Sequence, residues 1–513
     1  MYAGRVSTVL PGQAVSLWMD TTPETDYPAL SEDLTVDVAV IGGGISGLTT
    51  ALLLARAGKS VVVLEADRIG TSTTGHTTGK VTALQQITYT ALAVKHGEAG
   101  ATAYGEANRA GVDMIRELIE QYDIGCDAVQ RPTYTYATSR DTLGELKSEA
   151  DLMKRIGLPA SLVTEAELPF RTVGAVTLAD QLAVHPRKLL IGLARAITEE
   201  GGRVFERTRV TGAEDATKER PGSVRADGGT ITADDVVIAT GAPTIDKGFF
   251  FTRNHPYRSY LIAVRLNGPL PEGMYINADQ PTGSLMPITV DGTEYLLVGG
   301  EGHAAGAPGN IRQRYQALER FAREHFDVLS VDYRWSTQDG KTVDEMPFVG
   351  HASPRSKHLW VITGLRKWGL SGGPAGALIL KDGILGQPNP WAKYYSPNRF
   401  KPLAGAGKFL SENMQTGLLY MKQRLSRGGS LADLAVGDGE VIRQGGERIA
   451  VYKNDDGELQ AVSAVCTHLQ CLVEFNDGDK TWDCPCHGSR FATDGSVLQG
   501  PAKEPLAKKD VSQ

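Results

Sequence analysis

The sequence lacks any long apolar run, and this sets the first limit on what the protein can be. A helix that crosses a bilayer needs about 18–20 mostly apolar residues, and no segment of the 513-residue chain approaches that length. Residues 1–20 also lack the charged segment and apolar stretch of a secretory signal peptide. We therefore expect a cytoplasmic protein with no membrane partner.

Positive charge and cysteine are scarce as well. The chain has 53 Lys and Arg against 60 Asp and Glu, a net charge of −7, and no basic stripe, which argues against a nucleic-acid partner. Of only five cysteines, four lie between positions 466 and 486. A disulfide framework would spread its cysteines along the chain and is unusual in the cytosol, so this cluster indicates a metal site.

What the chain does contain is a glycine motif inside a predicted βαβ unit. A buried strand is expected over 35–41, a helix over 45–58 and a second strand over 60–65. The residues at the first turn, GGGISG, fit G-x-G-x-x-G in the setting that the motif requires. Gly42 permits the tight turn, Gly44 lets the backbone approach a pyrophosphate, and Gly47 lets helix and strand pack closely.

The residue that ends the second strand supports a nucleotide site. Glu65 stands where a carboxylate accepts hydrogen bonds from a ribose 2′-hydroxyl, and it would repel the 2′-phosphate of NADP. The free N–H groups and positive dipole of the helix beginning near Ile45 favour the phosphates. The fingerprint itself does not distinguish FAD from NAD.

The loop over 67–79 (DRIGTSTTGHTTG) resembles the segment that wraps the FAD in the D-amino-acid/glycine/sarcosine oxidase superfamily. The resemblance extends over residues 35–385 through VHP at 184–186, the segment 203–210, VIATG at 237–241, TVDEMPFVG at 342–350 and ITGLRKWGLSGGPA at 362–375. It implies noncovalent FAD, unless a histidine is attached. The FAD contacts that it implies are Gly42, Gly44, Gly47, Glu65, Arg68, Thr74, Gly75, Thr78, Gly364, Gly369, Ser371 and Gly372.

The resemblance also suggests catalytic residues. In amino-acid-oxidising members, Arg and Tyr hold the substrate carboxylate, a task that suits the guanidinium fork. Arg258 and Tyr260, at the start of a predicted antiparallel segment, are the candidates here, although a surface Arg and a core Tyr are an equally simple interpretation. Lys367 lies in the loop expected near the flavin ring, and the alternative for it is a solvated loop charge.

The cysteine cluster has the form C-x-H followed by C-x-x-H. Two Cys and two His can also bind zinc, but zinc fingers pair Cys with Cys and His with His. One Cys and one His in each loop suit a two-iron cluster with thiolates on one iron and imidazoles on the other. CTHLQC and CPCHGS resemble the two boxes of cytochrome bc-type Rieske proteins. The predicted ligands are Cys466, His468, Cys484 and His487.

The Rieske resemblance implies two further features. Cys471 and Cys486 occupy the positions that a disulfide joins in that family. Ser489 matches a serine that donates to a bridging sulfide, whereas Phe491 stands where the family has a tyrosine, so one hydrogen bond to the cluster is missing. We expect a potential below that of respiratory Rieske proteins.

These features predict the domains and the function together. We expect an N-terminal extension over 1–34, and an α/β Rossmann-like FAD domain interleaved with an α+β antiparallel-sheet substrate domain over 35–386. A linker with a connector helix over 387–428 and a small all-β Rieske domain over 429–513 follow. The favoured function is oxidation of an amine or N-alkyl amino acid, with electrons passing from FAD to the [2Fe–2S] cluster and on to an external acceptor. The alternatives are a reductase or electron-transfer hub and a redox sensor.

Overall fold

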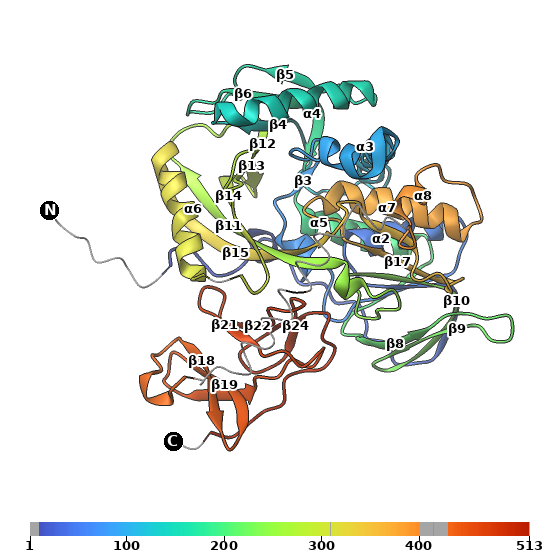
Figure 1. Ribbon diagram of the computed structural model, residues 1–513. Coiled ribbons are helices and arrows are strands. Elements are labelled where there is room, and N and C mark those ends of the chain that lie inside the picture. Colours follow the sequence, from blue (N-terminus) through green and yellow to red (C-terminus); the bar gives the residue numbers. More distant parts are fainter. Residues whose placement is uncertain (1–9, 308, 400–413, 415–428, 512–513) are drawn as a thin grey trace.

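The computed structural model describes residues 10–307, 309–399, 414 and 429–511 (Figure 1). Two large sheets with their helices form the upper part of the view, and a small β domain from the C-terminal part of the chain packs beneath them. This confirms the predicted combination of an α/β domain, an antiparallel-sheet domain and a small all-β domain. The connector helix expected within 408–425 falls outside the described residues, apart from Met414.

The first sheet is built on the predicted βαβ unit. Its eight strands include the path β16-β17-β10-β1-β2-β7, in which every pairing except the antiparallel β16-β17 is parallel, and β9 and β8 extend it from β10. The strands are β1 Leu34–Ile41, β2 Val61–Leu64, β7 Arg203–Phe205, β8 Val210–Glu214, β9 Gly222–Ala226, β10 Gly229–Gly241, β16 Phe348–His351 and β17 Leu359–Thr363. The single extended segment expected over 203–210 is instead two strands, because Arg207 turns the chain at φ 51°.

Helices cover this sheet and bury the main core. The second half of β1, residues 38–41, and all four residues of β2, VVVL, are buried as in parallel sheets generally. Helix α2 packs on both α5 and α7, and α7 packs on α3. These helices are α2 Ile45–Arg56, α3 Tyr89–Gln121, α5 Pro186–Glu199, α7 Gly369–Ile384 and α8 Ala392–Tyr395, whereas α4 Leu143–Arg155 packs on α3 and on the second sheet.

The second sheet has nine strands and is mainly antiparallel. Its order is β15-β11-β14-β13-β12-β4-β6-β3, with β5 beside β6. The strands are β3 Lys80–Val81, β4 Val129–Ala137, β5 Ser161–Val163, β6 Gly174–Ala183, β11 Asn254–Leu266, β12 Met274–Asn277, β13 Ser284–Val290, β14 Thr293–Ala304 and β15 Val328–Thr342. Helix α6 (Ile311–His325) packs on β11 and β14. The long strands β11 and β15 pair over their whole lengths and reach towards the first sheet.

The N-terminal segment is anchored to the loop that follows β2. Its short helix α1 (Leu17–Asp20) carries Trp18, which is fully buried and whose indole N–H donates to the Thr77 carbonyl at 2.7 Å. The predicted extension therefore holds the loop in place from outside. No helix among the described residues is long and apolar enough to cross a membrane.

The C-terminal domain consists of two small antiparallel sheets. One contains β18 Gly439–Gln444, β19 Glu447–Lys453 and β20 Leu459–Ser463, and the other β21 Glu474–Asn476, β22 Thr481–Asp483, β23 Arg490–Phe491 and β24 Val497–Gln499. The cysteine-containing loops precede β21 and separate β22 from β23. Trp482 and Phe491, both fully buried, pack with the cysteines in the core of this domain.

Candidate cofactor sites

The glycine motif forms a cradle whose space exists only because its residues have no side chains. Gly42 has φ 112°, and a Cβ there would lie 2.7 Å from the Ala239 carbonyl oxygen. A Cβ on Gly47 would lie 2.0 Å from the Gly42 oxygen, so only glycine lets α2 begin this close to β1. Gly44, the N-cap of α2, has no side chain to bond the first turn, and the Ile45 N–H donates to the Thr74 hydroxyl at 3.3 Å. The helix N-terminus is therefore open to an anionic ligand, as dinucleotide binding requires.

Glu65 stabilises this turn. Its carboxylate accepts the Gly43 N–H at 2.7 Å and the Asp67 N–H at 3.1 Å. Burial raises the pKa of Glu65, and these N–H donors lower it. The carboxylate thus lies at the end of β2 with its two oxygens in position to accept further hydrogen bonds from a ribose.

A cavity of about 1600 Å³, including its open mouth, runs from this cradle past the ends of both sheets. Six of the residues predicted to contact FAD line it: Gly42, Gly44, Glu65, Thr74, Gly364 and Gly369. Residues 338–340 also line it, whereas the following segment 342–350, which the resemblance placed at the flavin, does not. A cradle of glycines, an acidic strand end and a long cavity fit an extended dinucleotide.

The other six predicted FAD residues do not line the cavity: Gly47, Arg68, Gly75, Thr78, Ser371 and Gly372. Arg68 instead pairs with Glu24 of the N-terminal segment. Ser371 is buried and hydrogen-bonded to Gln85 and Asn108, at 3.0 and 3.1 Å.

The predicted cluster ligands come together at the tip of the C-terminal domain. The thiols of Cys466 and Cys484 are buried and lie within hydrogen-bonding contact of each other. The rings of His468 and His487 have centroids 5.1 Å apart, and the Nδ1 atoms of both are buried without a hydrogen-bond partner among the described residues. Burial lowers the pKa of both imidazoles, to about 4 for His487, which keeps them neutral. Two thiols and two unpartnered ring nitrogens fit the ligand set of a [2Fe–2S] cluster.

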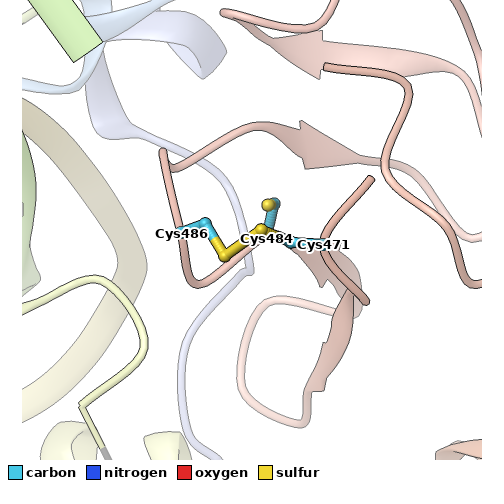
Figure 2. A group of neighbouring side chains, drawn as sticks. All are labelled: Cys471, Cys484 and Cys486. Carbon is cyan, nitrogen blue, oxygen red and sulfur yellow. A yellow bond between two sulfur atoms is a disulfide. The ribbon is translucent and has the colours of Figure 1, made fainter. Parts of the chain in front are cut away.

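The disulfide expected from the Rieske resemblance is present. Figure 2 shows Cys471 and Cys486 joined through their sulfurs with the Cys484 thiol beside them, and all three sulfurs lie within 4.8 Å of one another. The bond ties the two cluster loops together. Ser489 accepts a hydrogen bond from the Ala502 N–H at 3.0 Å and donates to Cys466.

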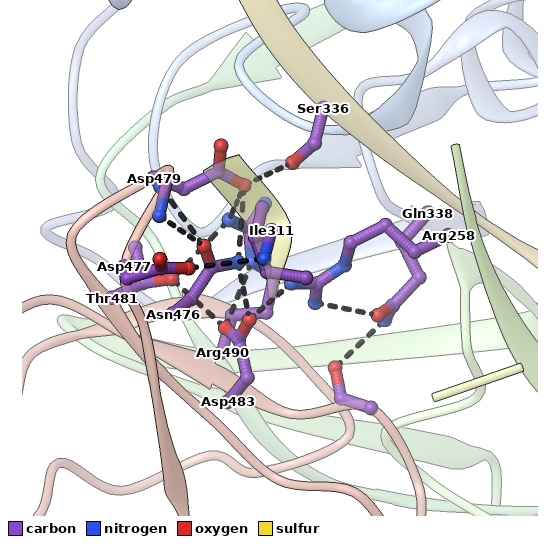
Figure 3. Close-up of polar contacts among 12 residues, drawn as sticks. Arg258, Ile311, Ser336, Gln338, Asn476, Asp477, Asp479, Thr481, Asp483 and Arg490 are labelled. Carbon is purple, nitrogen blue, oxygen red and sulfur yellow. Dashed lines mark hydrogen bonds and ion pairs between the residues drawn. The ribbon is translucent and has the colours of Figure 1, made fainter. Parts of the chain in front are cut away.

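Arg258 has another task than the one predicted for it. Its guanidinium is buried, does not line the cavity, and pairs with Asp483 of the C-terminal domain and with Gln338, the latter at 2.9 Å (Figure 3). Gln338 in turn donates to the carbonyl of Gly488, next to a cluster ligand, at 2.7 Å. Since both ends of the fork are engaged, Arg258 joins the domains and is not placed to hold a substrate carboxylate.

Tyr260 and Lys367 also have defined surroundings. Tyr260 is fully buried in the core under α6, and its hydroxyl lies 2.8 Å from His303 Nε2, away from the cavity. The ammonium of Lys367 lies 5.1 Å from the centre of the Tyr257 ring. Burial lowers the pKa of Lys367, and Asp339, which lines the cavity, raises it.

An acidic loop docks the C-terminal domain. Asp479 accepts hydrogen bonds from Tyr315 on α6, at 2.7 Å, and from Ser336 on β15, while Asp477 accepts the N–H of Ile311 at 3.1 Å. Within its own domain Asp479 also pairs with Arg490, at 2.9 Å. These partners lie far away in the sequence, and nothing in the local patterns around them indicated a docking surface.

The docked domain contributes to the cavity itself. Its lining includes the predicted cluster ligand His487, the segment 497–500 and Lys503. Phe251 of the first domain contacts the rings of His487 and His468, with centroid distances of 5.4 and 6.4 Å. One cavity therefore meets both the glycine cradle and a predicted iron ligand.

Comparison with known proteins follows the same division of the chain. The family model described as FAD dependent oxidoreductase (DAO) matches residues 37–382, and the model described as Rieske [2Fe-2S] domain matches residues 429–510. The chain is 33% identical over 497 residues to the Rieske 2Fe-2S iron-sulfur protein YhfW of Bacillus subtilis, covering 96% of this chain and 97% of the relative.

Two further similarities concern the first of these regions. Gamma-glutamylputrescine oxidoreductase of Escherichia coli is 30% identical over 63% of this chain and 78% of its own length. The crystal structure of glycine oxidase from Geobacillus kaustophilus superposes with a TM-score of 0.59 at 20% identity, over 72% of this chain and 99% of that one. The last similarity concerns the fold alone.

Proposed function

Because this chain belongs to the family of FAD dependent oxidoreductases and carries a Rieske [2Fe-2S] domain, we propose that it oxidises an amine or N-alkyl amino acid and passes the electrons through the cluster to an external acceptor. The chain is thus an oxidoreductase with two cofactors, FAD and a [2Fe–2S] cluster. FAD accepts a hydride equivalent, and the cluster carries one electron at a time.

One observation carries the proposal: His487, a cluster ligand, lines the same cavity as the glycine cradle. Electrons that enter at the FAD would therefore have an outlet at the wall of the same cavity. Phe251 lies between the first domain and both histidine rings, with centroid distances of 5.4 Å to His487 and 6.4 Å to His468. The outlet makes direct reoxidation by oxygen unnecessary.

The chain also offers groups that suit an amine substrate. Asp339 lines the cavity, and burial raises the pKa of its carboxyl, so that it can hold a proton taken from a substrate ammonium. Lys367 lies over the Tyr257 ring and does not line the cavity; its charge lowers the pKa of Asp339 from behind the wall. Asp339 would therefore face the substrate amine, and Lys367 would act on it as a positioning residue.

The test is anaerobic mixing of the enzyme with amines, amino acids and NADH in turn, with flavin absorbance and cluster EPR followed together. The proposal expects one class of amine to bleach the flavin and then to produce the reduced-cluster signal. In the Cys484→Ser variant, which removes a cluster ligand, the same amine should bleach the flavin without any cluster signal. Bleaching by NADH while every amine is inactive would instead assign a reductase that feeds a partner.

A further inference from the structure

We infer that the Rieske domain forms part of the FAD-binding site, so that FAD binding and docking of this domain stabilise each other. The inference rests on the location of the FAD cavity and not on the direction of electron flow. It assigns Gln499 and Lys503, which lie after the cluster motif, to the binding of a cofactor held mainly by another domain.

The first support is that the wall is continuous across the domain boundary. Lys503 Nζ donates to the carbonyl of Thr211, on β8 beside the lining residue Val210, at 2.9 Å. The Gln499 amide lies 3.4 Å from the Thr73 hydroxyl, in the loop that follows β2. A Cβ on Gly500 would lie 2.9 Å from the Thr244 side chain, so the two surfaces touch closely.

The second support is the charge on this wall. Lys503 is partly buried, and burial together with its neighbours Lys247 and Arg225 lowers its pKa. Arg209 also lines the cavity. Cations gathered on one side of a buried space favour an anionic occupant, and the diphosphate of FAD supplies that charge.

The third support is that docking is built from contacts outside the cavity. Tyr315 and Ser336 donate to Asp479, and neither of the two donors lines the cavity. Removing these two hydrogen bonds therefore tests the docking of the domain without changing any residue that could contact FAD directly. If FAD touches the wall only in the docked state, thermodynamic linkage requires that FAD strengthens docking by the same factor by which docking strengthens FAD binding, so a variant that populates the undocked state binds FAD more weakly.

The experiment follows FAD release from the holoprotein in the absence of substrate. Protein is diluted, and the fluorescence of free FAD gives the release rate and the dissociation constant. The wall variant is Gln499→Ala with Lys503→Ala, and its control is Lys509→Ala, which removes a lysine of the same tail that pairs with the exposed Glu447. The docking variant is Tyr315→Phe with Ser336→Ala, and its control is Ser330→Ala on the same strand.

Both variants should release FAD faster and bind it at least about fivefold more weakly than their controls. The reduced-cluster EPR signal should be unchanged, which excludes loss of the Rieske fold. Dissociation constants within twofold of the controls for the wall variant would overturn the assignment of Gln499 and Lys503. If the wall variant binds FAD more weakly than its control while the docking variant binds FAD as tightly as its own control, the linkage would be overturned. Neither result depends on the substrate or on the electron acceptor.

Discussion

Arg258 provides the sharpest test of how the two domains work together. Its guanidinium pairs with the carboxylate of Asp483. Burial raises the pKa of the Asp483 carboxyl, but the charges of Arg258 and Arg490 outweigh burial and hold this pKa well below its usual range. Removal of one partner of a buried ion pair typically costs about 3–5 kcal/mol. Because Arg490 and Asn476 still contact Asp483, at 3.2 and 2.8 Å, we take the lower end of that range.

A cost of about 3 kcal/mol changes the ratio of docked to undocked domain by roughly 100-fold. In Arg258→Met, the undocked fraction should therefore rise, and reduction of the cluster should lag behind bleaching of the flavin. Anaerobic stopped-flow absorbance with freeze-quench EPR measures both steps on one sample.

The companion variant Asp483→Asn and the double variant complete a cycle, in which we expect a coupling of about 1–3 kcal/mol. Cluster reduction as fast as in the unmodified protein would refute the docking role. A loss of flavin bleaching that excess substrate restores, with the cluster step unchanged, would show that Arg258 holds the substrate after all.

Three further predictions concern single residues. Burial raises the pKa of Asp339, and only the deprotonated carboxylate can accept a proton, so the rate of flavin reduction by substrate should increase as pH rises through that pKa. The variant Asp339→Asn should lose this increase with pH and reduce the flavin about 100-fold more slowly. Gly47→Ala should abolish FAD binding, because its Cβ would lie 2.0 Å from the Gly42 oxygen; flavin absorbance of the purified protein measures this, and full occupancy would contradict it. Phe491→Tyr should raise the cluster potential by roughly 60–120 mV if its hydroxyl donates to the cluster, as an EPR-monitored redox titration would show; an unchanged potential would contradict the missing bond.

The sequence predicted those parts of the molecule that local patterns determine. The βαβ unit, its glycine turn and Glu65 follow one another within about 30 residues, and each has a fixed place relative to the next strand. The four predicted cluster ligands likewise lie in two short loops, where their spacing indicated a cluster. The disulfide between the same loops was expected from the Rieske resemblance and is present.

Long-range partners could not be predicted in this way. Arg258 and Asp483 are 225 positions apart, and each looks like an ordinary strand or loop charge in its own surroundings. Arg68 was expected at the FAD, but the N-terminal segment supplies Glu24 as its partner. Lys503 carries no motif, and only the docking of one domain on another brings it to the cavity.

The docking contacts explain why a Rieske domain is useful behind a flavin domain. A mobile carrier must search for its donor, whereas this domain is held by buried ion pairs and hydrogen bonds that join β22 and the loop before it to β11, β15 and α6. That arrangement fixes His487 at the wall of the FAD cavity.

His468 is absent from the cavity lining, and the next residue, Leu469, is 45% exposed. The two imidazoles therefore differ in their surroundings, because one lines the cavity and the other lies next to an exposed apolar side chain. This asymmetry matches the proposed electron path, in which the cluster would receive electrons from the cavity side and deliver them at the surface.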